Sequence, residues 1–208
     1  MKEYHKIQTV FLRDPANKYR TLLTGEFAKP EFAYLQHNEW AFTEKVDGTN
    51  IRVMFNGVAI TFGGKTDRSQ IPAKLVTRLN ERFLPQLELF KEQFPDGVCL
   101  YGEGYGAKIQ KGGGNYRSDQ DFVLFDVKIG DWWLKRVDAL DISMKLGLDI
   151  VPVIGRGTLH DMVKYVQSRF ISYWGDFYAE GIVARPRLEL KARNGKRIIT
   201  KLKHKDFE

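Results

Sequence analysis

The segment Thr43-Glu44-Lys45-Val46-Asp47-Gly48 combines a lysine with a turn, and this combination could support nucleophilic chemistry. An ordinary lysine amine has a pKa of about 10.4, so it is protonated and unreactive at neutral pH. Nearby cations or burial lower that pKa and make the amine a nucleophile, which could then reach the α-phosphate of a nucleotide. The plain alternative is a hairpin turn with exposed charges. Lys45 is therefore a candidate nucleophile only if the fold brings other positive charges to it.

A second pair of lysines lies near the end of the chain, in Lys201-Leu202-Lys203. Alternate residues of a strand share one face, so both ammonium groups would point the same way. Beside Lys45 they would lower the pKa of the nucleophile and neutralise charge that develops on a phosphate. Taken alone, the pair also suits a solvated strand edge, where lysines discourage aggregation.

Two glutamates and a phenylalanine complete the candidate side chains. Glu103 is flanked by glycines that allow close backbone approach, so it could accept hydrogen bonds from ribose hydroxyls. Glu180 precedes an apolar run and could hold a divalent ion, which prefers oxygen ligands. One face of Phe125 could stack on a purine. The ordinary alternatives are a polar turn residue, a strand-entry residue and a core aromatic, respectively.

Short strands with tight turns and a few helices must position these residues. Helices are predicted at 73–94, 138–146 and 159–170. Strands are predicted at 40–46, 51–55, 58–62, 98–102, 122–127, 180–185 and 197–203. Pro85 should kink the first helix, Thr158 should cap the last, and Asp47-Gly48, Asn56-Gly57 and Asn194-Gly195 should be turns between strands. We therefore expect an α+β fold built on antiparallel sheets.

Composition bounds the class of protein. The chain has 208 residues, of which 43% are hydrophobic, and this is core-forming material for one globular domain. No apolar run approaches the roughly 20 residues of a membrane-spanning helix, the start of the chain is charged, and its single cysteine cannot form an internal disulfide. We expect a cytoplasmic protein, or one of the host cytoplasm if phage-encoded. Its formal charge of +7 favours a polyanionic partner such as nucleic acid.

The order of the candidate segments resembles the covalent nucleotidyltransferases, which include DNA ligases, RNA ligases and mRNA-capping guanylyltransferases. Five segments resemble motifs I, III, IIIa, IV and V of that superfamily: Lys45-Val-Asp47-Gly48, Tyr101-Gly-Glu103-Gly, Phe122–Val127, Glu180-Gly181 and Lys201-Leu-Lys203. The resemblance covers essentially the whole chain. It implies a nucleotidyltransferase (ATP-grasp-like) domain of antiparallel sheets flanked by helices, spanning residues 1–208.

Within the superfamily, the chain is most similar to phage-type ATP-dependent RNA ligases related to T4 RNA ligase 2. Glu44 directly precedes the lysine and Asn50 follows it by five residues, as in that branch. The opening His5–Phe11 and the segment Gly64–Pro72, where motif Ia is expected, are similar too. Motif Ia often carries an arginine, so the resemblance leaves Lys65 or Arg68 for that position.

The resemblance implies a reaction in three steps. Lys45 attacks ATP to give lysyl-AMP and pyrophosphate, AMP passes to an RNA 5′-phosphate, and an RNA 3′-hydroxyl then displaces AMP to close the phosphodiester. Magnesium or manganese would relieve charge on the triphosphate. The partner would be RNA with 5′-phosphate and 3′-hydroxyl ends, nicked or single-stranded, and the protein would be a monomer without a membrane.

The same resemblance implies a role for each candidate residue. Glu103 would contact the AMP ribose, Phe125 would pack on adenine, and Glu180 would act near the metal. Lys201 and Lys203 would hold the α-phosphate. The remaining nucleotide-site residues would be Glu44, Asp47, Asn50 and Lys65.

Three further expectations follow. The chain ends soon after Lys203, so the OB or helical domain that follows the catalytic domain in relatives is expected to be missing. The alternatives are a small DNA ligase, a capping-type guanylyltransferase, or a non-catalytic RNA-binding domain of the same fold.

The glycine-rich stretch Lys111–Arg117 could be a mobile loop, a groove for RNA or a plain connection.

Overall fold

The computed structural model describes residues 3–208, which divide into two compact units. Unit 1 consists of the residues up to His5 together with Asp47–Val151. Unit 2 consists of Lys6–Val46 and Pro152–Glu208. Each unit has its own sheet and its own hydrophobic core. The prediction of a single domain over residues 1–208 stays a prediction.

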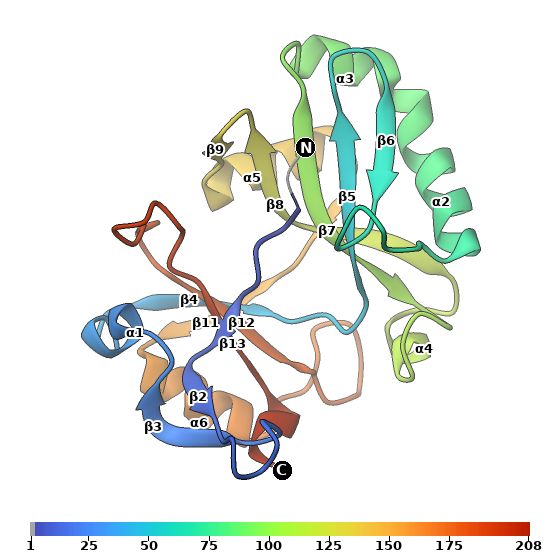
Figure 1. The fold of residues 1–208 in the computed structure, drawn as a ribbon. Helices are drawn as coiled ribbons and strands as arrows, with labels where there is room; N and C mark the ends of the chain where they lie inside the picture. The colour runs from blue at the N-terminus through green and yellow to red at the C-terminus, as the bar shows by residue number, and fades with distance from the viewer. Residues whose placement is uncertain (1–2) are drawn as a thin grey trace. The chain divides into compact units, whose positions relative to one another are not determined.

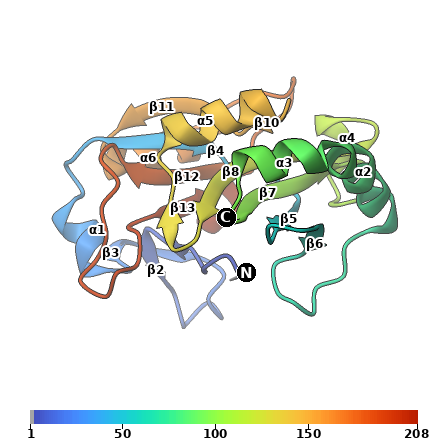
Figure 2. The ribbon, with the colours of Figure 1, turned by 90° about the horizontal axis from the view of Figure 1, so that it is seen from above.

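Unit 1 is a largely antiparallel sheet with helices packed on one face (Figures 1 and 2). Its strands are β5 (Thr49–Phe55), β6 (Ile60–Gly63), β7 (Val98–Gly106), β8 (Gln120–Ile129), β9 (Trp132–Trp133) and β10 (Asp149–Ile150). They are ordered β10-β8-β7-β5-β6, with β9 on β8 and with β10 parallel to β8. Its helices are α2 (Ala73–Phe83), α3 (Leu87–Gln93), α4 (Gly113–Tyr116) and α5 (Arg136–Lys145).

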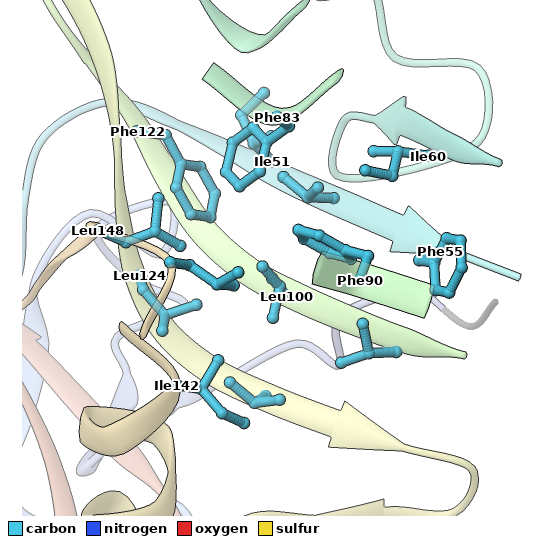
Figure 3. Packing of buried hydrophobic residues seen from close by; sticks show 14 of the residues in the cluster. Ile51, Phe55, Ile60, Phe83, Phe90, Leu100, Phe122, Leu124, Ile142 and Leu148 are labelled. Carbon is cyan, nitrogen blue, oxygen red and sulfur yellow. The ribbon is translucent and has the colours of Figure 1, made fainter. Parts of the chain in front are cut away.

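The core of unit 1 follows from the spacing of apolar residues in α2. Leu75, Leu79 and Phe83 recur every four residues, so they share one face of the helix, and all three are fully buried. Figure 3 shows Phe83 together with Phe122 of β8 and other buried side chains of the sheet. The predicted helix over 73–94 is split by a 3-10 turn at Leu84–Gln86, because Pro85 interrupts α-helical hydrogen bonding.

Unit 2 is built on a five-stranded sheet ordered β1-β13-β12-β4-β11. Its strands are β1 (Gln8–Thr9), β4 (Trp40–Glu44), β11 (Val153–Gly157), β12 (Gly181–Pro186) and β13 (Thr200–Lys203), and all pairs except β1–β13 are antiparallel. A separate pair, β2 (Phe11–Arg13) and β3 (Leu22–Phe27), and the helices α1 (Pro30–Tyr34) and α6 (Leu159–Gln167) contribute residues to the same core. A short 3-10 helix, His204–Phe207, follows β13.

Most turn and cap predictions are confirmed. Asn56 accepts hydrogen bonds from the backbone N–H groups of residues 58 and 59, and Gly57 has a φ of 91°, as a tight turn requires. Thr158 caps α6 in a capping box with Asp161. The chain is an α+β protein of largely antiparallel sheets with flanking helices, as predicted.

Asp47-Gly48 lies between two strands, as predicted, but these strands do not pair with each other as a hairpin would require. β4 pairs with β11 and β12, whereas β5 pairs with β6 and β7 in the other sheet. Asp47-Gly48 therefore lies where the chain passes from unit 2 into unit 1. Among residues 3–208, no helix has both the length and the hydropathy needed to cross a bilayer.

Candidate active site

In unit 2, two lysines from distant parts of the sequence meet at one carboxylate. The Nζ atom of Lys45 lies 2.5 Å from Oε2 of Glu180, and the Nζ atom of Lys203 forms an ion pair with Oε1 of the same group. The side chains of the three residues are 12–21% exposed, so the cluster is mostly shielded from water but still reachable. The predicted encounter between Lys45 and a lysine of the last strand is therefore present.

Strand register brings these residues together. Gly181 of β12 is paired with Lys203 of β13, and its carbonyl accepts a hydrogen bond from the backbone N–H of Lys45. Lys45 and Lys203 thus flank Gly181 on either side. A Cβ at Gly181 would lie 2.0 Å from the carbonyl oxygen of Leu202, so this close approach of strands requires glycine.

Lys201 lies two residues before Lys203 on β13, so it shares the face of the sheet that carries Lys203. Its register partners are Thr9 and Val183. The structure places both predicted phosphate-binding lysines on one face.

Glu44 faces the other side of the sheet from Lys45. It is 1% exposed, and its carboxylate accepts hydrogen bonds from the hydroxyl of Ser172 at 2.6 Å and from the backbone N–H of Tyr173 at 2.8 Å. Burial raises the pKa of Glu44, and the hydrogen bonds from Ser172 and Tyr173 act against that rise. Here Glu44 holds the loop that precedes Glu180. Its predicted contact with a nucleotide stays a prediction.

In unit 1, Asn50 and Glu103 are opposite one another in the β5–β7 register. The strand pairing therefore places two predicted ribose-site residues side by side. Gly48 makes this possible, because a Cβ there would lie 2.2 Å from the carbonyl oxygen of Gly104 and 2.8 Å from Cγ of Glu103. The glycine of the Lys-x-Asp-Gly segment is thus needed for close backbone approach and not for a hairpin turn.

Phe125 occupies an irregularity in β8. Tyr101 pairs with Asp126 and Gly102 pairs with Leu124, so Phe125 is the extra residue of a bulge. Its side chain is only partly buried, and its ring packs edge-on against Tyr4, with 5.0 Å between centroids. A partly exposed aromatic ring suits the predicted stacking on adenine.

Asp47 and the predicted motif Ia residues also belong to unit 1. The backbone N–H of Asp47 donates to the hydroxyl of Tyr116 at 3.1 Å. Lys65 and Arg68 are both exposed, so the structure does not favour one of them over the other for the motif Ia position.

Sequence reasoning overlooked Arg52, which organises the loop containing Lys65 and Arg68. Arg52 is 1% exposed and donates to the carbonyl of Gly64 at 2.9 Å and to the carboxylate of Asp67 at 2.7 Å. Its position two residues after Asn50, on the same strand face, was the available signal.

The described residues offer limited means to hold a metal ion by themselves. Within residues 3–208, no group of three or more His, Cys, Asp or Glu side chains is arranged for this. Both oxygens of Glu180 are paired with ammonium groups, so a metal ion that binds this carboxylate must displace a lysine from it. Its predicted role near a metal stays a prediction.

The ten predicted site residues fall into two groups. Unit 2 carries Glu44, Lys45, Glu180, Lys201 and Lys203, and unit 1 carries Asp47, Asn50, Lys65, Glu103 and Phe125. The first group contains the candidate nucleophile with its charged neighbours. The second contains the candidate groups for a nucleoside.

Solved structures share this fold. A variant of the Naegleria gruberi RNA ligase with ATP and Mn has 19% identity and a TM-score of 0.64, over 85% of this chain and 54% of that one. A second variant with ATP and Mn has 16% identity and a TM-score of 0.69, over 98% and 56%. The same ligase with PPi has 17% identity and a TM-score of 0.68, also over 98% and 56%. The chain thus has the nucleotidyltransferase fold of RNA ligases and spans little more than half of these relatives.

A family model described as RNA ligase matches residues 38–203, which is most of the chain and contains every predicted site residue. The chain belongs to the RNA ligase family. No curated protein sequence gives a significant match. Membership of the phage-type branch stays a prediction.

Proposed function

We propose that this protein is an ATP-dependent RNA ligase in which Lys45 is the residue that becomes adenylated. The observation that carries the proposal is the pair of ammonium groups, Lys45 and Lys203, on the two oxygens of Glu180. Membership of the RNA ligase family supports it. The N. gruberi ligase structures with ATP or AMP and Mn support ATP as the substrate and a divalent metal ion as the cofactor.

In the first step, Nζ of Lys45 forms a bond to the α-phosphorus of ATP. The bond from that phosphorus to the oxygen bridging to the β-phosphate breaks, and pyrophosphate leaves. The amine must release protons as the N–P bond forms, and Oε2 of Glu180 lies within hydrogen-bonding distance of it. Lys203 and Lys201 supply positive charge on the same face, which stabilises the charge developing on the phosphate oxygens.

The residues present fit a divalent metal that is shared with the substrate. Magnesium commonly binds to one or two carboxylates together with substrate phosphates, so Glu180 does not need a cluster of protein ligands around it. When bound, the metal would neutralise charge on the triphosphate. Glu180 is the residue we assign to hold it.

The nucleoside is assigned to the residues of unit 1. Asn50 and Glu103 offer an amide and a carboxylate to the ribose hydroxyls, and Phe125 offers a ring to adenine. The adenylyl group then passes from Lys45 to the 5′-phosphate of RNA, which releases the amine. Attack by an RNA 3′-hydroxyl on that phosphate forms the phosphodiester and releases AMP.

Intact-mass measurement after incubation with ATP and Mg²⁺ or Mn²⁺ tests the proposal. We expect the native protein to gain one adenylyl group and Lys45→Ala to gain none. A matched control is Lys191→Ala, because Lys191 is an exposed lysine of the same unit. A native protein that stays unmodified in the presence of either metal would contradict the proposal.

Two parallel assays separate the alternatives. Incubation with GTP identifies a capping-type enzyme, because such an enzyme would gain a guanylyl group instead. Nicked substrates with RNA or DNA strands distinguish an RNA ligase from a DNA ligase. RNA binding that persists in Lys45→Ala, without adenylation of the native protein, would indicate a non-catalytic RNA-binding domain.

A further inference from the structure

Unit 1 contains a cavity of about 460 Å³ that none of the assigned site residues lines. It lies between one face of α2 and the segment that follows β7. Its wall is formed by Lys74, Thr77, Arg78, Glu81, Ala107, Lys108, Ser118, Asp119 and Gln120. The α2 residues recur every three or four positions, so they form one stripe on the helix face away from its buried leucines.

The wall carries more positive than negative charge. Lys74 and Lys108 are exposed, and Arg78 adds a third cation. Of the two wall carboxylates, Asp119 is already paired with Arg117, which lowers the pKa of Asp119 by hydrogen bonding and keeps it ionised. The lysine charges therefore remain available to an anion.

Arg78 is held in place by a rigid charged cluster. The buried carboxylate of Asp121 binds the guanidinium groups of Arg78 at 3.1 Å, Arg82 at 2.7 Å and Arg117 at 2.9 Å. Burial alone would raise the pKa of Asp121, but these groups and the backbone N–H of Phe122 bring it below its ordinary value. Three guanidinium groups are shared by two carboxylates, Asp121 and Asp119, which leaves a surplus of one positive charge beside the cavity.

Two buried polar atoms of the wall have no hydrogen-bond partner in the described part of the chain: Nε of Arg78, a donor, and Oε1 of Gln120, an acceptor. Buried polar atoms are normally satisfied, so these two need an explanation. A phosphate oxygen would provide the acceptor that Arg78 lacks, whereas Oε1 of Gln120 is itself an acceptor and needs a donor.

The segment that lines the cavity also contacts the Lys-x-Asp-Gly motif. The side-chain amide of Gln110 donates to the carbonyl of Gly48 at 3.0 Å, and Tyr116 accepts from the backbone N–H of Asp47. Residues 107–119 therefore connect the cavity to the start of the nucleotide site within unit 1.

We propose that this cavity binds a backbone phosphate of the RNA substrate, with Lys74, Arg78 and Lys108 as its cationic contacts. The inference rests on the proposed function for the identity of the polyanion. It adds a substrate-holding site in unit 1 that is separate from the residues assigned to the nucleotide. Free polyphosphate, including the triphosphate of ATP, presents the same chemistry, so the test must distinguish the two sources.

The experiment compares the native protein with Lys74→Ala/Lys108→Ala. Arg78 is left in place because it pairs with the buried Asp121. The matched control is Lys135→Ala/Lys145→Ala, two exposed lysines elsewhere in unit 1. Dissociation constants for labelled RNA with a 5′-phosphate are measured over a series of salt concentrations, and the rate of lysyl adenylation is measured separately without RNA.

We expect the cavity variant to bind RNA several-fold more weakly and to flatten the slope of log affinity against log salt by about 0.7 to 0.9, the change expected when one phosphate contact is lost. RNA-free adenylation should keep its native rate and its native dependence on ATP. The control should keep the native slope.

Three outcomes would overturn the inference. A native salt slope in the cavity variant would show that the two lysines do not contact RNA phosphates. An equal loss of slope in the control would show that net charge alone is responsible. A higher ATP requirement with unchanged RNA binding would assign the cavity to the triphosphate. Failure of the native protein to become adenylated would contradict the proposed function, while the salt slopes would still report on the cavity.

Discussion

At the scale of single residues, the charges around Glu180 bear on how Lys45, the proposed nucleophile, is protonated. A carboxylate at 2.5 Å favours the charged ammonium form of Lys45, whereas the neighbouring cation Lys203 favours the neutral amine. The fraction of Lys45 in the reactive neutral amine form therefore depends on how strongly Glu180 interacts with Lys45 compared with Lys203. A substrate or metal that draws on this carboxylate would weaken its hold on Lys45.

Replacing Lys203 by methionine tests this balance, because the substitution removes the charge and keeps much of the side-chain volume. Lys203→Met should slow lysyl adenylation by about 10²–10³-fold, the usual cost of removing one group that stabilises charge in a transition state. Single-turnover adenylation with labelled ATP measures the effect. Lys191→Met is the control, and a native rate in Lys203→Met would refute the role of this cation.

The buried carboxylate of Glu44 should leave a signature in the pH dependence of stability. Because burial raises the pKa of Glu44 above its ordinary value of 4.5, the folded protein keeps a proton there at pH values where the unfolded chain has lost it. Stability contributed by this group is thus present below pH 4.5 and is lost as pH rises through the folded pKa.

Glu44→Gln cannot titrate, so the comparison isolates this group. The unfolding free energy of the native protein minus that of the variant should fall as pH rises from 4.5 and then level off. Urea unfolding at a series of pH values provides the measurement. A difference that stays flat, or that grows with pH, would show that Glu44 is not a carboxylate with a raised pKa.

At the scale of elements, the alternation of side chains along β4 and β13 places core residues on one face and lysines on the other. On β4, Trp40 and Phe42 enter the core, and Lys45 continues the opposite face. On β13, Leu202 enters the same core between two lysines. The strands that make the core of unit 2 therefore also present its cations.

This alternation is why the sequence predicted the strands that become β4, β12 and the end of 197–203, and the shared face of Lys201 and Lys203. The sequence did not predict the short strands β1, β2, β3 and β11 of the same unit, and it could not show which strands pair. Asp47-Gly48 has the local signal of a hairpin, but β4 has its partners at Gly181–Pro186 and Val153–Gly157, more than a hundred residues away. Local turn chemistry cannot reveal such partners, because pairing over long separations is decided by packing of the whole sheet.

The close approach of β12 and β13 gives a prediction for the element as a unit. In Gly181→Ala, the new Cβ would meet the backbone of Leu202, so the two strands must separate. We expect a loss of about 1–3 kcal/mol in stability and slower adenylation, since Glu180 and Lys203 flank this contact. Urea unfolding and the adenylation assay give the two readouts.

Gly114→Ala is the matched control for that substitution, because no atom lies within 4 Å of a Cβ built at Gly114. Its stability should change by no more than about 0.5 kcal/mol. Equal stability of the two variants would mean that β12 and β13 can separate at Gly181 without cost, and it would contradict the prediction.

At the scale of the whole molecule, motif order was readable from the sequence, whereas the division of the chain was not. The five segments identified the family because their residue types are fixed by chemistry. The assignment of Lys45 to one unit and of Asn50 and Glu103 to the other depends on which sheet each strand joins. Arg52, Asp121 and the cavity beside α2 escaped prediction because their partners are distant in sequence or lie on other elements.

The two cores share no residue, so each should respond separately to a local defect. Leu79 and Met162 are fully buried, Leu79 in unit 1 and Met162 in unit 2, and truncation of either to alanine should cost about 2–5 kcal/mol. In Leu79→Ala, hydrogen exchange should quicken first at the amides of β5, β7 and β8. In Met162→Ala, it should quicken first at those of β4, β12 and β13. These strands carry the residues proposed for the nucleoside and the cluster around Glu180, respectively. Loss of protection spread equally over both sheets in both variants would instead mean that the chain unfolds as one cooperative body.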